Sequence, residues 1–219
     1  RFINDNKPYI TQSREVRRIT KKVAAMIRDK GSLIRITHEQ CPFCNGDQVT
    51  VIAQKDRYGL PLDTQICDKC ELVFSSKYFS ADFAEDYYAN YADKFKSLNQ
   101  SPKEMFERRT APKAYTWIRQ NYIKEYLGNN YKKLQTVIEV GCNDGCNLYP
   151  YHLDGKKVVG CDFDDQRMDT GRAVGLTILS GGIDVLFHEG YKADLLILSH
   201  SLEHMVDIDE VFQNARELL

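Results

Sequence analysis

The stretch Val137-Ile-Glu-Val-Gly-Cys-Asn-Asp-Gly145 decides the fold. It reads as an apolar strand that runs directly into a loop containing Gly141 and Gly145. Glycine lets the chain turn tightly into a following helix, and it lets a ligand approach the bare peptide. The spacing differs from GxGxxG and lacks a phosphate-loop lysine, so the loop alone does not identify a ligand.

The segments that follow this loop alternate between strand-like and helical patterns. Together with the strand before the loop, the strongly apolar segments are Thr136–Val140, Lys157–Cys161, Leu176–Leu179 and Ala193–Leu198. Helical candidates lie between them, and a last helix is predicted over 207–219. Continuous apolar strands that alternate with helices indicate a parallel sheet covered on both faces. The predicted fold class is therefore α/β, with a Rossmann-like sheet of about four strands.

Polar residues stand where these strands end. Asp162 lies about 20 residues beyond the loop, where an acid can accept hydrogen bonds from both ribose hydroxyls of an adenosyl group. Asp184, after the third strand, could meet an adenine amino group. For each aspartate the alternative is a helix cap. A polar cluster, Ser199-His-Ser-Leu-Glu-His204, follows the fourth strand.

Two paired-cysteine motifs mark a different region. Cys41-Pro-Phe-Cys44 and Cys67-Asp-Lys-Cys70 are separated by 22 residues. Each motif places two thiolates on a tight turn, and two such turns can close a tetrahedron around zinc. Four protein ligands leave no open position, so the predicted metal is structural. Iron in the same ligands and a redox-active pair remain alternatives.

The chain divides into four predicted parts. These are a basic N-terminal helical segment (1–38), a zinc-binding lobe (39–80), a helical connector (81–134) and a ligand-binding Rossmann-like domain (135–219). In the first part, Ser13 is predicted to cap an amphipathic helix over 13–30 that Gly31 ends. In the third, Asp82 is predicted to cap a tyrosine-rich helix.

Charge is distributed unevenly along the chain. Residues 1–38 carry ten Lys and Arg against three Asp and Glu, whereas residues 135–219 carry six against fifteen. An acidic sheet domain is poorly suited to nucleic acid, so a nucleic-acid partner is not expected. No apolar run reaches the length of a membrane span, and no secretory signal is evident. Seven cysteines then indicate a reducing compartment, and we expect a cytoplasmic protein.

The motifs together resemble those of class I SAM-dependent methyltransferases. The segments that carry this resemblance are Glu139-Val-Gly-Cys-Asn-Asp-Gly145, Gly160-Cys-Asp162 and the polar cluster that ends in His204. Paired zinc knuckles, a tyrosine-rich helix and an E-x-G-x-N-D-G loop, in that order, are similar to the sugar C-methyltransferases of polysaccharide and antibiotic-sugar biosynthesis. The resemblance covers residues 41–219.

The resemblance implies a role for each matching residue. Gly141, Asn143 and Gly145 would cradle the methionine part of S-adenosylmethionine (SAM), and Asp162 would hold its ribose. Glu139 and Ser199 belong to the matching motifs and are expected at the cofactor site, together with Asp184. By the resemblance, His204 would be the base, and Tyr88 or Tyr91 would reach toward a sugar. Glu203 could orient His204.

The expected activity is therefore methyl transfer from SAM to a small acceptor, such as a nucleotide-linked sugar or glycan intermediate. Alternatives are an RNA methyltransferase that uses the zinc lobe, and a non-enzymatic zinc-ribbon interaction module. Two positions depart from the family pattern: Glu71 replaces the usual glycine after the last knuckle, and residues 55–62 lack the asparagine of the C-methylating branch. The family sheet has seven strands, so we expect a further C-terminal segment or a partner to complete it.

Overall fold

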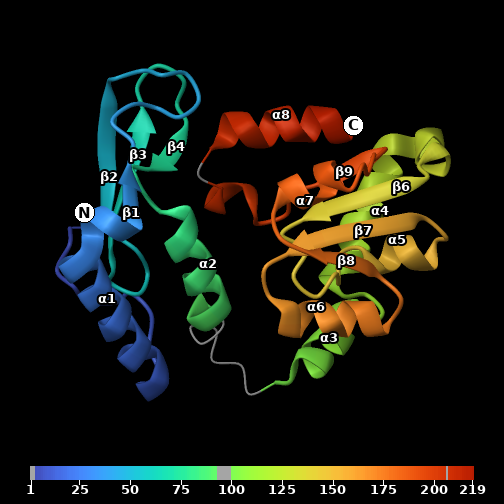
Figure 1. Cartoon of the computed structure of the whole chain (residues 1–219), viewed down its shortest axis with the longest axis horizontal. Coiled ribbons are helices and arrows are strands. Elements are labelled where there is room, and N and C mark those ends of the chain that lie inside the picture. Colours follow the sequence, from blue (N-terminus) through green and yellow to red (C-terminus); the bar gives the residue numbers. More distant parts are fainter. Residues whose placement is uncertain (1–2, 93–99, 206) are drawn as a thin grey trace. The chain divides into compact units, whose positions relative to one another are not determined.

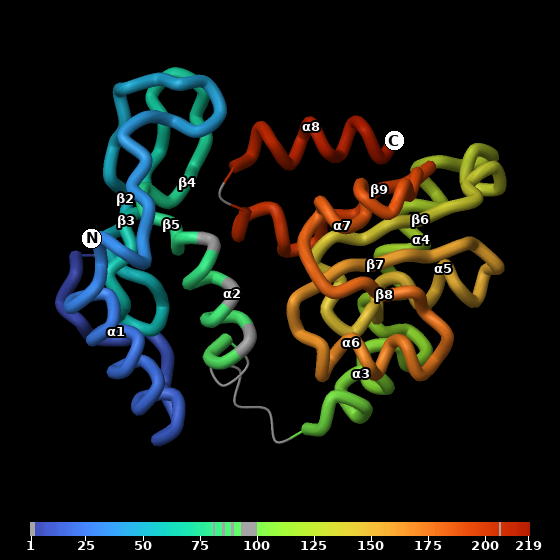
Figure 2. Tube along the Cα trace, viewed as in Figure 1, coloured from blue at the N-terminus to red at the C-terminus, as the bar shows by residue number. Residues whose placement is uncertain are grey.

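The computed structural model describes residues 3–92, 100–205 and 207–219. The chain forms two compact units, which we call the first unit (1–98 with 206–208) and the second unit (99–205 with 209–219). Figures 1 and 2 show both units, coloured along the sequence from blue at the N-terminus to red at the C-terminus. In the described part of the chain, no helix combines the length and the apolarity needed to cross a membrane.

The described residues of the first unit form two α-helices and two small antiparallel sheets. The helices are α1 (Arg14–Ile34) and α2 (Ala81–Asn90), and the strands are β1 (Arg35–Thr37), β2 (Val49–Lys55), β3 (Pro61–Cys67), β4 (Val73–Ser75) and β5 (Lys77–Phe79). β1 pairs with β5, and β3 lies between β2 and β4. One apolar cluster joins α1 to the β2–β3 turn and α2, and another surrounds the cysteines.

Two helix boundaries of the first unit differ from the sequence prediction. Ser13 caps α1 as predicted, because its side chain accepts from the Val16 amide. The helix does not end at Gly31, however: it kinks at Lys30 and continues to Ile34. The N-cap of α2 is Ser80, not Asp82, because the Ser80 hydroxyl accepts from the Phe83 amide. Asp82 instead lies in the first turn, where its charge suits the helix dipole.

The second unit is built on one parallel sheet. Its strands are β6 (Thr136–Val140), β7 (Lys157–Asp162), β8 (Thr177–Ser180) and β9 (Leu195–Ile197), in the order β8-β7-β6-β9. The helices are α3 (Pro102–Thr110), α4 (Tyr115–Leu127), η2 (Gly128–Lys133), α5 (Tyr149–Leu153), α6 (Asp165–Ala173), α7 (Ile183–His188), η3 (Leu202–His204) and α8 (Ile208–Leu218). The predicted Rossmann-like α/β fold is confirmed, and each predicted strand is within two residues of its observed bounds at either end.

Alternate residues of the central strand enter two different cores. Val137 belongs to the cluster that contains Phe106 of α3 and Met168 of α6, whereas Ile138 belongs to the cluster that contains Leu186 of α7 and Leu218 of α8. Helices therefore cover both faces of the sheet, as Figure 1 shows. A strand buried on both faces is apolar at nearly every position, and β6 departs from this pattern at Glu139.

The strand order fixes where the chain reverses direction across the sheet. From β6 the chain proceeds to β7 and then β8 on one side, and β9 pairs with β6 on the other side. The carboxyl ends of β6 and β9 thus flank a topological switch point, the place where open α/β sheets bind their ligands. The loop quoted above follows β6 at this point.

The four-part division of the chain stays a prediction, although α3 and α4 of the predicted connector pack in the second unit.

Candidate functional site

The four cysteines of the two knuckles come together in the first unit. Cys41 Sγ lies 3.6 Å from Cys70 Sγ, and Cys44 Sγ lies 3.6 Å from Cys67 Sγ. All four sulfur atoms lie within 4.8 Å of one another. Sulfurs bound tetrahedrally at about 2.3 Å from zinc would be about 3.8 Å apart, so the thiols fit a structural zinc site.

The backbone of each knuckle explains how two cysteines reach one point. Asn45 and Glu71, the residues that follow the second cysteine of each pair, both adopt left-handed backbone with φ of 54° and 61°. Their amides donate to the carbonyls of Cys41 and Cys67 and close the two turns. Position 71 therefore has the conformation that glycine adopts most readily, which explains why glycine is usual there.

In the second unit, the glycine loop passes close to the segment after β9. Gly141 has φ of 72°, and a Cβ there would lie 2.6 Å from the Ser201 Cβ. Gly145 has φ of 73°, and a Cβ there would lie 2.7 Å from Leu176. A side chain at position 141 would collide with Ser201, and at both positions the positive φ is a conformation that residues with a side chain rarely adopt. Gly141 itself is exposed, which leaves its peptide open to a ligand.

Asp162 fixes the loop from the neighbouring strand. Its Oδ2 accepts from the Asn143 amide at 2.7 Å, and its Oδ1 accepts from the amides of Phe163 and Asp164. Asp162 is not a helix cap, because Asp164 caps α6. One acceptor position remains on Oδ2, so holding both ribose hydroxyls would require the exchange of one of these backbone bonds.

Glu139 is buried in the sheet just before the loop. Its Oε1 accepts from Asn147 Nδ2 at 2.7 Å. Its Oε2 is buried and has no partner among the described residues, and the same holds for Ser201 Oγ. Burial raises the pKa of Glu139 to about 8, although the Asn147 hydrogen bond opposes this shift. Two unmatched polar atoms therefore lie beside the glycine loop.

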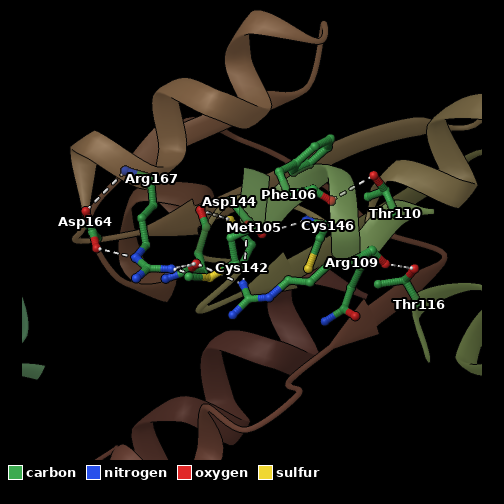
Figure 3. A network of polar contacts seen from close by, with 12 residues as sticks. Met105, Phe106, Arg109, Thr110, Thr116, Cys142, Asp144, Cys146, Asp164 and Arg167 are labelled. Carbon is green, nitrogen blue, oxygen red and sulfur yellow. Dashed lines mark hydrogen bonds and ion pairs between the residues drawn. The ribbon is translucent and has the colours of Figure 1, made fainter. Parts of the chain in front are cut away.

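Two arginines converge on the loop from the helices (Figure 3). Arg109 of α3 forms an ion pair of 3.2 Å with the buried Asp144, and it lies 3.5 Å from Asn143 Oδ1. Arg167 of α6 lies 3.5 Å from the same oxygen and pairs with Asp164 at 3.2 Å. Both arginines thus contact the side chain of Asn143, a residue with left-handed backbone and φ of 54°.

A third arginine, Arg119 of α4, reaches the switch point itself. Its Nη1 donates to Ser199 Oγ at 2.9 Å and to Asn147 Oδ1 at 3.2 Å. Asn147 in turn bonds Glu139, so side chains from α4, the loop, β6 and the end of β9 form one chain of contacts. Ser199 is therefore placed at the switch point together with Glu139.

The predicted catalytic residues after β9, Glu203 and His204, both lie in η3. Glu203 Oε1 also lies 3.5 Å from His200 Nδ1, a contact that the sequence did not predict. His204 is exposed in η3. His200 also has φ of 59°, a strained value for a residue with a side chain, and such strain is frequent at functional sites. Catalytic roles for Glu203 and His204 stay predictions.

The other predicted residues lie further from the loop or in the first unit. Asp184 is exposed in the first turn of α7, whose N-cap residue is Gly182. Tyr91 packs against the α1 cluster, with the Lys22 ammonium 4.9 Å from its ring centre. The ring of Tyr88 contacts Tyr87 edge-on at 5.5 Å. Their proposed contact with a substrate stays untested.

The sequence analysis missed Arg109, Arg119 and Asn147. The two arginines lie on helices that precede the loop by about 20 to 30 residues, and no spacing rule connects them to it. Asn147 follows Gly145 by two residues, and the only indication of its role in the sequence is that its side-chain amide can form hydrogen bonds. All three enter the site through tertiary contacts alone.

Solved structures that match part of this chain include the plantazolicin methyltransferase BpumL in complex with a pentazolic desmethylPZN analog and SAH (14% identity, TM-score 0.47, covering 63% of this chain and 52% of that chain). WbdD matches with 25% identity and a TM-score of 0.39, covering 46% of this chain and 26% of that chain. A SAM-dependent methyltransferase from Archaeoglobus fulgidus matches with 17% identity and a TM-score of 0.38, covering 52% and 50%.

Two of these three structures are named as methyltransferases. The chain spans about half of their length or less. No family model matches the chain, and no curated protein matches it. Function is therefore inferred below from the chain's own residues.

Proposed function

We propose that the chain is a SAM-dependent methyltransferase that binds its cofactor at the glycine loop of the second unit. The observation that carries this proposal is the position of the loop at the switch point between β6 and β9. Ligands of open α/β sheets bind outside the carboxyl ends of the strands at such a point. The exposed peptide of Gly141 lies there.

The unmatched polar atoms support a ligand at this position. Glu139 Oε2 and Ser201 Oγ are buried and have no partner in the part of the chain that the structure describes, and each such atom costs about 1–3 kcal/mol. A ligand that presents hydrogen-bonding groups along the loop would remove part of this cost. The residues therefore fit SAM, with its methionine part along Gly141 to Asn143 and its ribose at Asp162.

The reaction would need little from the protein beyond positioning. SAM, when bound, supplies a methyl carbon on a positively charged sulfur. The loop and Asp162 would hold the cofactor so that an acceptor could be positioned in line with this carbon, and a base of the chain would take the acceptor's proton. His204 is our predicted base, and His200, which Glu203 holds at 3.5 Å, is a second candidate. Imidazole is a common general base in proteins.

The proposed acceptor is a small molecule, such as a nucleotide-linked sugar or a glycan intermediate. The family resemblance suggests this class, and the excess of acidic residues over 135–219 disfavours a polyanion such as RNA. The zinc site has a supporting role, because a lobe with so small a core depends on metal binding for folding free energy.

Calorimetry with S-adenosylhomocysteine (SAH) on the zinc-loaded protein tests the proposal. We expect SAH to bind, and Asp162→Asn to weaken binding by about tenfold or more because a charge-assisted hydrogen bond is lost. Asp165→Asn is the matched control, since Asp165 is exposed on the adjacent helix, and it should leave the affinity unchanged. No binding to the wild type, or equal effects of the two variants, would contradict the proposal.

A further inference from the structure

The Arg119 guanidinium is only partly used by the fold. Its Nη1 donates to Ser199 and Asn147, while Nε and Nη2 have no hydrogen-bond partner among the described residues. Arg119 is exposed, so these two donors point to solvent or to a ligand. A guanidinium edge with two free N–H groups matches the two oxygens of a carboxylate.

The contacts of Arg119 place that edge beside the glycine loop. Asn147, which accepts from Arg119, donates to Glu139 at the end of β6. Ser199, the second acceptor, stands just after β9. Arg119 is thus attached to both strands that flank the switch point, and the Tyr115 ring lies 4.8 Å beneath its guanidinium and restricts its motion.

The same cluster contains an acid whose second oxygen is unmatched. Glu139 Oε2 is buried without a partner among the described residues, and the Asn147 side chain links this carboxyl group to Arg119. Arg119 and Glu139, which the Asn147 amide joins, are together complementary to a ligand that carries both a carboxylate and an ammonium. Such a ligand has the chemistry of a free amino acid.

We propose that Arg119 binds the α-carboxylate of the methionine part of the cofactor, and that Asn147 and Ser199 position its guanidinium. This inference rests on the proposed function and adds a specificity-determining residue to it. The alternative is a purely structural role, in which Arg119 only ties α4 to the sheet.

Two ligands distinguish these roles. SAH contains the amino-acid part, whereas 5′-methylthioadenosine has the same adenosine and sulfur but lacks the carboxylate. We expect Arg119→Gln to weaken SAH binding by about tenfold to a hundredfold, as expected for a charge-assisted pair. The affinity for 5′-methylthioadenosine should change by less than about twofold. Arg119→Lys should give an intermediate loss for SAH, since it keeps the charge but not the planar fork.

Arg108→Gln is the matched control, because it removes an exposed positive charge from α3 of the same unit, and it should leave both affinities unchanged. Equal weakening of both ligands by Arg119→Gln would show a structural role and overturn the inference, as would unchanged SAH affinity. If the wild type bound 5′-methylthioadenosine but not SAH, the inference would also fail while adenosyl binding survived. If it bound neither ligand, the proposed function itself would fail.

Discussion

Gly141 offers a quantitative test of the loop geometry through the variant Gly141→Ala. The new methyl group would lie 2.6 Å from the Ser201 Cβ, whereas carbon atoms prefer about 3.5–4.0 Å. The residue also has φ of 72°, which costs an alanine about 1–2 kcal/mol. Overpacking of this kind adds about 1–3 kcal/mol. We therefore expect a loss of about 2–5 kcal/mol in the free energy of unfolding.

Gly155→Ala separates the two contributions. Gly155 has φ of 75°, but a Cβ there would meet nothing within 4 Å. This variant should lose only the conformational part, so the two variants should differ by about 1–3 kcal/mol. Urea unfolding of the zinc-loaded protein measures both. Adding Ser201→Gly to Gly141→Ala should recover the difference. Equal destabilisation by the two alanine variants would refute the close approach of Ser201 to the loop.

Three further predictions concern the metal and two acids. Cys67→Ser should abolish the binding of one zinc per chain, measured by metal analysis, and should remove the unfolding transition of the first unit; retained stoichiometric zinc would contradict the four-cysteine site. Glu71→Gly should stabilise the zinc-loaded first unit by about 1 kcal/mol, because φ of 61° suits glycine, and thermal unfolding would show a lower melting temperature if this reasoning is wrong. Burial raises the pKa of Glu139 from 4.5 to about 8 in the folded protein. As the pH rises, the Glu139 carboxyl group therefore loses its proton in the unfolded chain before it does so in the folded protein. Wild-type stability should thus fall relative to Glu139→Gln between about pH 5 and pH 8, and parallel pH profiles of the two proteins would contradict a buried acid.

The sheet was predictable from the sequence because its signal is local. β6 has the bounds that its apolar run predicts, since every residue between two covered faces must be buried. The two knuckles were predictable for a similar reason, because spacing alone brings each cysteine pair onto one turn. Helix ends were less predictable: Gly31 permits a helix to end but does not force it, and α1 continues to Ile34.

The polar contacts of the candidate site were not predictable in this way. Arg119 meets Asn147 and Ser199 only after α4 has packed on the sheet, and these residues are separated by 28 and 80 positions. The pairing of Glu203 with His200 depends on a backbone conformation at His200 that the sequence does not indicate. Motifs therefore identified the loop, whereas tertiary packing selects the side chains around it.

A crystal structure of the zinc-loaded protein soaked with SAH tests the central claim most directly. We predict density along the peptide from Gly141 to Asn143, with a ribose hydroxyl within hydrogen-bond distance of Asp162 Oδ2. SAH bound elsewhere on the protein, or a loop closed by the Ser201 side chain with no ligand at a saturating concentration, would contradict the assignment of this loop as the cofactor site.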